Sequence, residues 1–149
     1  MKRLAISLSA LLVSSVAVVA ADDPIAVRQS LMQAVAGAAG ASGGMLKGEI
    51  DYNPVVAKAA IATLYGVSQA YGDYFPEGSQ NGDTDAAPEI WEDMEGFHNA
   101  LADFQADAAA AFEAAGKDGP ADLAAFKAAV QPVLSNCRDC HESFRIQDD

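Results

Sequence analysis

The chain has little positive charge, little cysteine and few aromatic residues. Its 149 residues include 9 lysines or arginines against 21 aspartates or glutamates, for a formal net charge of −12 at pH 7. This excess of acid argues against nucleic acid or anionic lipid as a partner, because both are themselves negatively charged. It permits a basic protein partner, although acidic residues also simply keep a protein soluble. After the N-terminal segment no stretch is apolar enough to span a bilayer, which predicts a protein without a membrane anchor.

The N-terminal segment is typical of a secretory signal peptide. Lys2 and Arg3 precede an apolar run over residues 4–19, which ends in the small residues Ala20 and Ala21. The run is shorter than the roughly 20 apolar residues of a spanning helix and is interrupted by serines, so cleavage is favoured over an uncleaved anchor. Loss of residues 1–21 removes two basic residues and no acidic ones, which takes the charge from −12 to −14. Residues 22–149 are then expected to form a single domain outside the cytoplasm.

The abundance of alanine and the scarcity of consecutive β-branched residues predict an all-helical domain. Four helical stretches stand between proline and glycine signals, at about residues 24–47, 54–75, 88–115 and 121–146. Residues 76–87 are rich in glycine and short polar side chains and are expected to form the one long loop. Pro132 should bend the last helix, since it removes one backbone hydrogen bond. Four amphipathic helices with mostly short links predict an antiparallel four-helix bundle.

Apolar residues recur every three or four positions in these helices and predict the faces that pack together. The expected core positions are Val56, Ala60, Leu64, Val67, Tyr71 and Tyr74 in the second helix; Met94, Phe97, Leu101, Phe104, Ala108 and Ala111 or Phe112 in the third; and Leu123, Phe126, Val130, Val133, Cys137, Cys140 and Phe144 in the last. Both cysteines of the chain therefore fall on the packed face of the last helix.

The two cysteines stand three positions apart in the segment NCRDCHESFR, residues 136–145, and His141 follows Cys140 directly. A redox dithiol of the thioredoxin type needs its first cysteine at a helix N-terminus in a βαβ unit, whereas this pair lies near the C-terminal end of a predicted helix. A structural zinc site needs four ligands, and the chain offers only His98 besides this cluster. A disulfide between cysteines three apart closes almost no loop and stabilises little.

Covalent haem attachment fits the cluster better than these alternatives. Cysteines at i and i+3 place two sulfurs on one helical face, where they can form thioethers with the two vinyl groups of haem, and the adjacent histidine can supply an axial nitrogen to the iron. The pattern is short enough to arise by chance, but export, an all-helical chain and the lack of any further cysteine strengthen it. We therefore predict one haem c, attached through Cys137 and Cys140 with His141 as iron ligand; a dithiol or a metal site is the alternative.

Other segments accompany this motif: RQSLMQ at residues 28–33, KGE at residues 47–49, and PEIW at residues 88–91, followed by Phe97 and Phe104. With CRDCHESFR, they make the chain resemble the class II c-type cytochromes, the cytochrome c′ family with its low-spin relatives, over essentially its whole length after the signal peptide. The resemblance implies a four-helix bundle with one haem c, often a homodimer, in a bacterial periplasm. The loop at residues 76–87 varies in the family, so the rim of the haem crevice does not carry over.

The resemblance also implies roles for individual residues. Met32 falls at the position over the distal side of the haem, Arg28 near the haem propionates, and Arg145 near the axial histidine. Arg28, Met32 and Val35 also share one helical face. Met32 as ordinary core, Arg28 as a solvated charge at a helix start, and Arg145 as a cation at a helix C-terminus are the respective alternatives. Candidates to wall the haem are Phe97, Tyr74, Phe104, Tyr71 and Phe144; Trp91 is expected to cap the third helix, and His98 to lie on the surface.

Two functions follow from such a haem, and neither makes the chain an enzyme. If the Met32 sulfur binds the iron opposite His141, the protein is an electron carrier that serves redox partner proteins. If Met32 only packs over the iron, the open site binds nitric oxide or carbon monoxide. The KGE segment and the approach to the cysteines look closer to the low-spin branch, which favours the carrier. Peroxidase chemistry needs a distal base that the first helix lacks, and a purely structural bundle leaves the cysteine–histidine cluster without a purpose.

Overall fold

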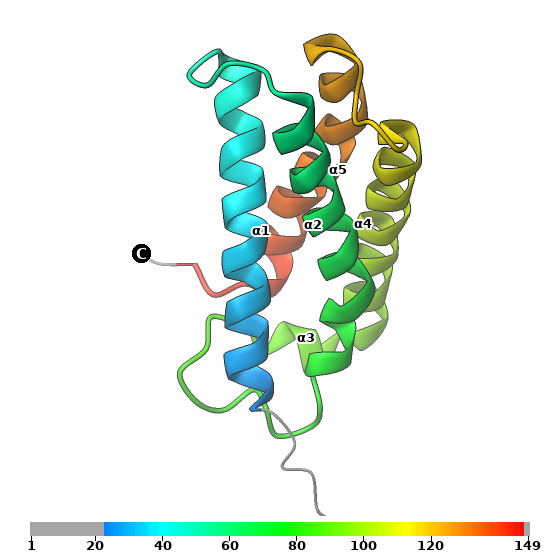
Figure 1. Cartoon of the computed structure of the whole chain (residues 1–149). Helices are drawn as coiled ribbons and strands as arrows, with labels where there is room; N and C mark the ends of the chain where they lie inside the picture. The colour runs from blue at the N-terminus through cyan, green and yellow to red at the C-terminus, as the bar shows by residue number, and fades with distance from the viewer. Residues whose placement is uncertain (1–22, 148–149) are drawn as a thin grey trace, which may run out of the picture.

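The computed structural model describes residues 23–147 and contains four long helices that run side by side (Figure 1). In chain order the elements are α1 (Pro24–Lys47), α2 (Pro54–Ala70), the 3-10 helix η1 (Tyr71–Tyr74), the short α3 (Glu89–Glu92), α4 (Met94–Ala115) and α5 (Leu123–Phe144). Helices α1, α2, α4 and α5 alternate in direction, which confirms the predicted antiparallel four-helix bundle. The predicted signal peptide lies outside the described residues, and within them no helix has both the length and the apolar character to cross a membrane.

The bounds of α1 follow from its capping residues and agree with the prediction. Asp23 is the N-cap, and its side chain accepts a hydrogen bond from the backbone N–H of Ile25 at 3.0 Å. Pro24 occupies the first turn, where no intrahelical N–H is needed. Gly48 ends the helix in the left-handed conformation, with φ 74°, and this conformation favours glycine because it has no Cβ.

The second predicted helix is shorter than expected in its α-helical form. Asn53 caps α2 by accepting hydrogen bonds from the backbone N–H groups of Val55 and Val56. The α-helix ends at Ala70 and tightens into η1, so the Tyr71 and Tyr74 side chains belong to a 3-10 turn and not to the regular α-helical face. Phe75, just after η1, is buried.

The prediction of one continuous helix over residues 88–115 is wrong. The chain breaks at Asp93, with φ −125° and ψ 64°, between the single turn α3 and the long helix α4. The Asp93 carboxylate accepts a hydrogen bond from the backbone N–H of Gly96 at 2.9 Å and so caps α4. Aspartate is a preferred N-cap because its short side chain reaches these unpaired N–H groups, and here that preference stops the helix that begins after Pro88.

The main core lies between α1, α2, α4 and α5, as the apolar pattern predicts. Its buried residues are Val35, Ala38, Met45, Ala57, Ala60, Ile61, Leu64, Val67, Ala108, Ala111, Ala115, Phe126, Val130 and Val133. Two expected core residues near helix starts are exposed instead, Val56 at 41% and Leu123 at 38%. Ala111 is buried, whereas Phe112 lies outside the core and stacks on Tyr65. Helix α5 continues through Pro132 without a break.

A second, smaller cluster closes the end of the bundle where α5 finishes. Its buried members are Phe75, Ile90, Phe97 and Leu101, and Phe144 packs against them. The rings of Phe97 and Phe144 meet edge to face at 5.5 Å between centroids. The loop after η1 passes under the N-terminal end of α1 at this same end of the molecule (Figure 1). The last turn of α5 is therefore held by aromatic packing on one side and approached by a polar loop on the other.

Candidate functional site

The two cysteines lie in the C-terminal half of α5, beyond its most deeply buried stretch. Phe126, Val130 and Val133 have no exposed surface and fix the helix in the bundle. Cys137 and Cys140 follow on toward the C-terminal end of α5 and are half-buried and free, with no disulfide between them. The sequence predicted them on the packed face of this helix, and the structure places them at the margin of that face.

The acidity of the thiols argues against a redox dithiol. Burial raises the pKa of both Cys137 and Cys140, and each thiol lies near the C-terminal end of a helix, where the dipole disfavours a thiolate. A reactive dithiol needs the opposite environment. Within residues 23–147 no group of three or more His, Cys, Asp or Glu side chains is arranged to hold a metal ion.

His141 completes the cluster, and its environment disfavours protonation of the imidazole. Partial desolvation lowers the pKa of His141, and the nearby positive charge of Arg145 lowers it further. An iron ligand needs an unprotonated ring nitrogen, so this shift favours the ligating form. Two free thiols one helical turn apart with a neutral imidazole beside the second are the donor set that a covalently held haem requires. The residues present therefore fit the group that the sequence predicts.

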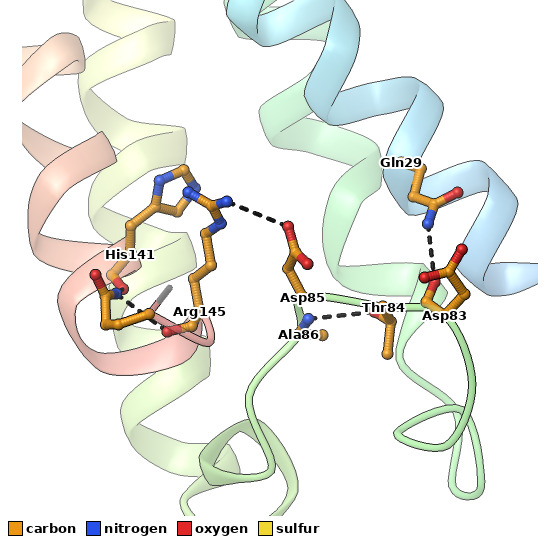
Figure 2. Close-up of polar contacts among 8 residues, drawn as sticks. Gln29, Asp83, Thr84, Asp85, Ala86, His141 and Arg145 are labelled. Carbon is orange, nitrogen blue, oxygen red and sulfur yellow. Dashed lines mark hydrogen bonds and ion pairs between the residues drawn. The ribbon is translucent and has the colours of Figure 1, made fainter. Parts of the chain in front are cut away.

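The chain after α5 folds back over the turn that carries His141. The side chain of Gln147 donates hydrogen bonds to the backbone carbonyls of His141, at 2.8 Å, and Arg145, at 3.1 Å. Arg145 also forms an ion pair with Asp85 of the loop before α3, at 3.2 Å (Figure 2). Sequence reasoning did not identify Gln147 or Asp85, because nothing in a polar loop or a chain terminus signals these distant contacts.

Arg28 is not a solvated charge at a helix start, because only 3% of it is exposed. Its Nη1 donates to the carbonyl of Tyr74 and to the hydroxyl of Ser79, both at 2.9 Å, and its Nη2 donates to the carbonyl of Ser79 at 2.8 Å and to Thr84 Oγ1 at 3.4 Å. Burial lowers the pKa of Arg28, although a guanidinium stays charged. Nε is buried and has no hydrogen-bond partner within the described residues.

Aromatic rings cover the guanidinium of Arg28 and complete its enclosure. Its central carbon lies 4.7 Å from the centroid of Phe75 and 5.7 Å from that of Trp91. The indole N–H of Trp91 donates to the carbonyl of Pro76 at 3.4 Å. Trp91 thus packs against the end of η1 and the buried arginine. The sequence analysis had instead predicted that Trp91 caps the third helix.

Met32 lies one turn after Arg28 on α1 and is partly buried against the main core. Val35 of the same face is buried, as the predicted helical face requires. Tyr71 of η1 packs against both hydrophobic clusters, and its ring meets that of Phe75 edge to face at 5.1 Å. Burial is the main cause that raises the pKa of Tyr71 to about 12.

The remaining predicted residues divide between the core and the surface. Phe97 is buried at the centre of the second cluster, next to Phe144. Tyr74 is partly buried, and its backbone carbonyl, not its ring, contacts Arg28. His98 is exposed, as predicted. Phe75, which the sequence analysis did not single out, contacts Arg28, Tyr71, Trp91 and Phe97; its position just before the loop proline was the only available signal.

A four-helix bundle whose last helix carries two free thiols one turn apart, followed directly by a histidine, is the arrangement of a c-type haem protein. A sequence model of the family described as Cytochrome C′ matches residues 23–145. The chain belongs to the cytochrome c′ family, whose members bind one covalently attached haem c and are electron-carrying or gas-binding proteins, not enzymes.

Individual relatives agree with this assignment. The chain is 34% identical over 120 residues to a cytochrome c-556 of Agrobacterium tumefaciens (strain II Chrys), across 80% of this chain and 94% of the relative. The solved structure of cytochrome c′ from Rhodopseudomonas palustris superposes with a TM-score of 0.76 at 34% identity, and covers 87% of this chain and 100% of that one. A nitric oxide complex of a mutant cytochrome c′ from Alcaligenes xylosoxidans gives 0.71 at 29% identity, over 83% and 94%.

Proposed function

We propose that the chain is a periplasmic electron carrier whose haem iron is held by His141 on one side and by Met32 on the other. When bound, haem c supplies an iron that alternates between the ferric and ferrous states. Cys137 and Cys140 would hold the group through their sulfurs, and a thioether ligand such as that of Met32 would stabilise the ferrous state and raise the potential.

The observation that carries the proposal is the position of Met32. Its side chain is partly buried against the main core, to which all four long helices contribute, so the thioether lies inside the bundle and not on its surface. Arg28, one turn earlier, is fixed by hydrogen bonds to the loop before α3. A helix held in this way supports a fixed position for the Met32 sulfur. A fixed ligand suits electron transfer because the site then rearranges little when the iron changes its oxidation state.

Burial around the site supports the same role. Phe97 and Phe144 pack edge to face beside the last turn of α5, and Tyr71 keeps its phenol protonated in this apolar setting. Apolar walls exclude water and favour the less charged form of a buried group. Arg28 Nε is the buried donor that we assign to a haem propionate, since a guanidinium pairs well with a carboxylate.

Gas binding is the second candidate, and a specific observation favours it. A relative of the same fold has been solved as a nitric oxide complex. In that case Met32 packs over the iron without binding it, and nitric oxide or carbon monoxide enters the apolar space beside it. The same residues surround the haem in both cases, so the two functions differ in the distance between the Met32 sulfur and the iron.

We assign residues 1–21 to a cleaved signal peptide and residues 22–149 to the single mature domain, with redox proteins as partners. A homodimer is supported by a groove of small residues between α1 and α2, lined by Ala34, Gly37, Ala38, Ala41, Val56, Ala59, Ala60 and Thr63. Val55, beside this groove, is 71% exposed. Sedimentation of the protein and of a Val55→Glu variant tests this face: a dimer lost in the variant supports it, and an unchanged mass excludes it.

Carbon monoxide tests the proposed function. The reduced wild-type protein should show sharp visible absorption bands that do not change when carbon monoxide is added. The Met32→Ala variant should bind carbon monoxide, and its absorption bands should shift. Leu31→Ala, a change of similar size on the preceding residue of α1, should behave as the wild type. A wild-type spectrum that shifts with carbon monoxide as readily as that of Met32→Ala would refute methionine ligation and establish the gas-binding alternative.

A further inference from the structure

Asn81 is followed directly by Gly82 in the loop before α3, and both residues are exposed. The backbone nitrogen of a glycine can attack the side chain of an asparagine before it, because glycine has no Cβ to hinder the approach. We propose that Asn81 is a site of spontaneous deamidation, which converts it into aspartate or isoaspartate, and that isoaspartate loosens the loop from α1. The proposal goes beyond the proposed function, since it depends neither on the haem nor on Met32.

The reaction needs only water besides the chain itself. The backbone nitrogen of Gly82 loses its proton and bonds to Cγ of Asn81, and the side-chain nitrogen leaves as ammonia. The cyclic imide that results then adds one water molecule. If the bond between the nitrogen and Cγ breaks, the product is aspartate. If the bond between the nitrogen and the main-chain carbonyl carbon breaks, the product is isoaspartate, whose main chain runs through Cβ and Cγ. Nothing is oxidised or reduced in either step.

Both reacting groups are free of hydrogen bonds to the protein. Among the described residues, neither the side chain of Asn81 nor the backbone N–H of Gly82 has a hydrogen-bond partner. The turn just before them is closed by a bond from the N–H of Ser79 to the carbonyl of Pro76, at 3.1 Å, and it ends before Asn81. The asparagine side chain and the glycine nitrogen therefore give up no protein hydrogen bond when they react.

The other asparagines of the chain lack this combination. Asn53 precedes Pro54, which has no backbone N–H, and its side chain caps α2. Asn99 is exposed but lies within α4, where regular hydrogen bonds engage the backbone N–H of the next residue. The side chain of Asn136 in α5 donates to Asp107 Oδ2 at 2.9 Å. The same molecule thus supplies internal references for the reactivity of Asn81.

Asn81 lies between two points at which α1 holds the loop. Arg28 Nη2 donates to the carbonyl of Ser79 at 2.8 Å. The side chain of Gln29 donates to the carbonyl of Asp83, also at 2.8 Å (Figure 2). Isoaspartate adds one methylene group to the main chain between these two points, whereas aspartate keeps the normal main-chain length. The isoaspartate form should therefore disturb the fit of the loop on α1, and the aspartate form should not.

The experiment ages the purified haem-loaded protein at neutral and at mildly alkaline pH and follows each asparagine by peptide mapping with mass spectrometry. Asn81 should convert to the acid faster than Asn99 or Asn136, with isoaspartate among the products. The conversion should be faster at the higher pH, because the attacking nitrogen must lose its proton. An Asn81 that stays an amide as long as Asn99 and Asn136 do overturns the proposal.

The variants are made at Asn81 and not at Gly82. Gly82 has φ 135°, and a Cβ there would lie 2.8 Å from Ile25 Cδ1, so any side chain would strain the loop for a separate reason. Asn81→Gln should not convert measurably, because its longer side chain must close a larger and less favourable ring. Asn81→Asp has the charge of the products with a normal main chain.

Urea unfolding then measures the effect on the loop. The isoaspartate form, purified from the aged wild-type protein, should unfold at a lower urea concentration than Asn81→Asp, which separates the added methylene from the added charge. Asn81→Gln aged in the same way should keep its stability. Equal stability of the isoaspartate form and Asn81→Asp, or a loss that aged Asn81→Gln shares, overturns the effect on the loop. These results are separate from methionine ligation, which carbon monoxide tests in the unaged protein.

Discussion

Arg28 on α1 donates two hydrogen bonds to Ser79, a residue 51 positions away in the loop before α3: Nη1 reaches the hydroxyl at 2.9 Å and Nη2 the carbonyl at 2.8 Å. Arg28→Ala should lower the free energy of unfolding by about 3 kcal/mol, because hydrogen bonds from a charged group are lost and a buried carbonyl is left unpaired. Urea unfolding followed by circular dichroism measures this loss.

Lys127→Ala supplies the control for Arg28. Lys127 is an exposed cation on α5, and its removal should change stability by no more than about 0.5 kcal/mol. Arg28→Lys keeps the charge but not the planar set of donors, so it should recover only part of the loss. Equal stability of Arg28→Ala and Lys127→Ala would mean that Arg28 does not hold the loop.

Cys137→Ala and Cys140→Ala should each weaken covalent haem attachment, and the double variant should abolish it. The thioether bonds need the two sulfurs, and the chain contains no other cysteine that could replace them. Haem staining after denaturing electrophoresis measures the retained group. Ser135→Ala, a change at an exposed position of the same helix, should stain as the wild type does. Full staining of the double variant would contradict attachment at these positions.

Tyr71 should make the protein sensitive to alkali. Burial raises its pKa in the folded state from 10.0 to about 12. The folded state therefore keeps the phenol proton at pH values where the unfolded chain releases it, so this stabilisation is complete below about pH 10 and is lost as pH rises toward 12. Unfolding free energies measured between pH 9 and 12 should fall less steeply for Tyr71→Phe than for the wild type. Parallel curves would show that Tyr71 titrates normally.

Asp93→Ala should cost about 1 kcal/mol of stability, because it removes the side chain that caps α4 through the N–H of Gly96. Asp103→Ala is the control, since that carboxylate is exposed in the middle of the same helix and caps nothing. Thermal unfolding of the two variants gives the comparison. If both melt alike, the cap does not determine where α4 begins.

The sequence predicted the fold closely wherever local signals decide the structure. Asp23, Pro24 and Gly48 mark the two ends of α1, and the structure has the same bounds. The break at Asp93 was missed, although aspartate is a preferred N-cap, because the apolar spacing continues across it from Ile90 to Phe97. Periodicity averages over a helix and does not reveal one residue whose side chain competes with the backbone for a hydrogen bond.

The sequence predicted only the part of the candidate site whose residues are neighbours in the chain. Cys137, Cys140 and His141 are adjacent in sequence and carry their own spacing signal. Arg28 was expected at the site, but its burial under Phe75 depends on contacts with a loop that has no periodicity. The pair of Asp85 and Arg145 depends on how that loop meets the chain end, and such a long-range register is not encoded in any short segment.

The central claim is that the sulfur of Met32 binds the iron opposite His141. X-ray absorption at the iron edge of the oxidised protein tests it directly, because a bonded sulfur scatters differently from nitrogen. One sulfur should be bonded to the iron in the wild-type protein and in Leu31→Ala, and none in Met32→Ala. An iron bonded only to nitrogen in the wild-type protein would contradict the claim and leave an open site for a gas.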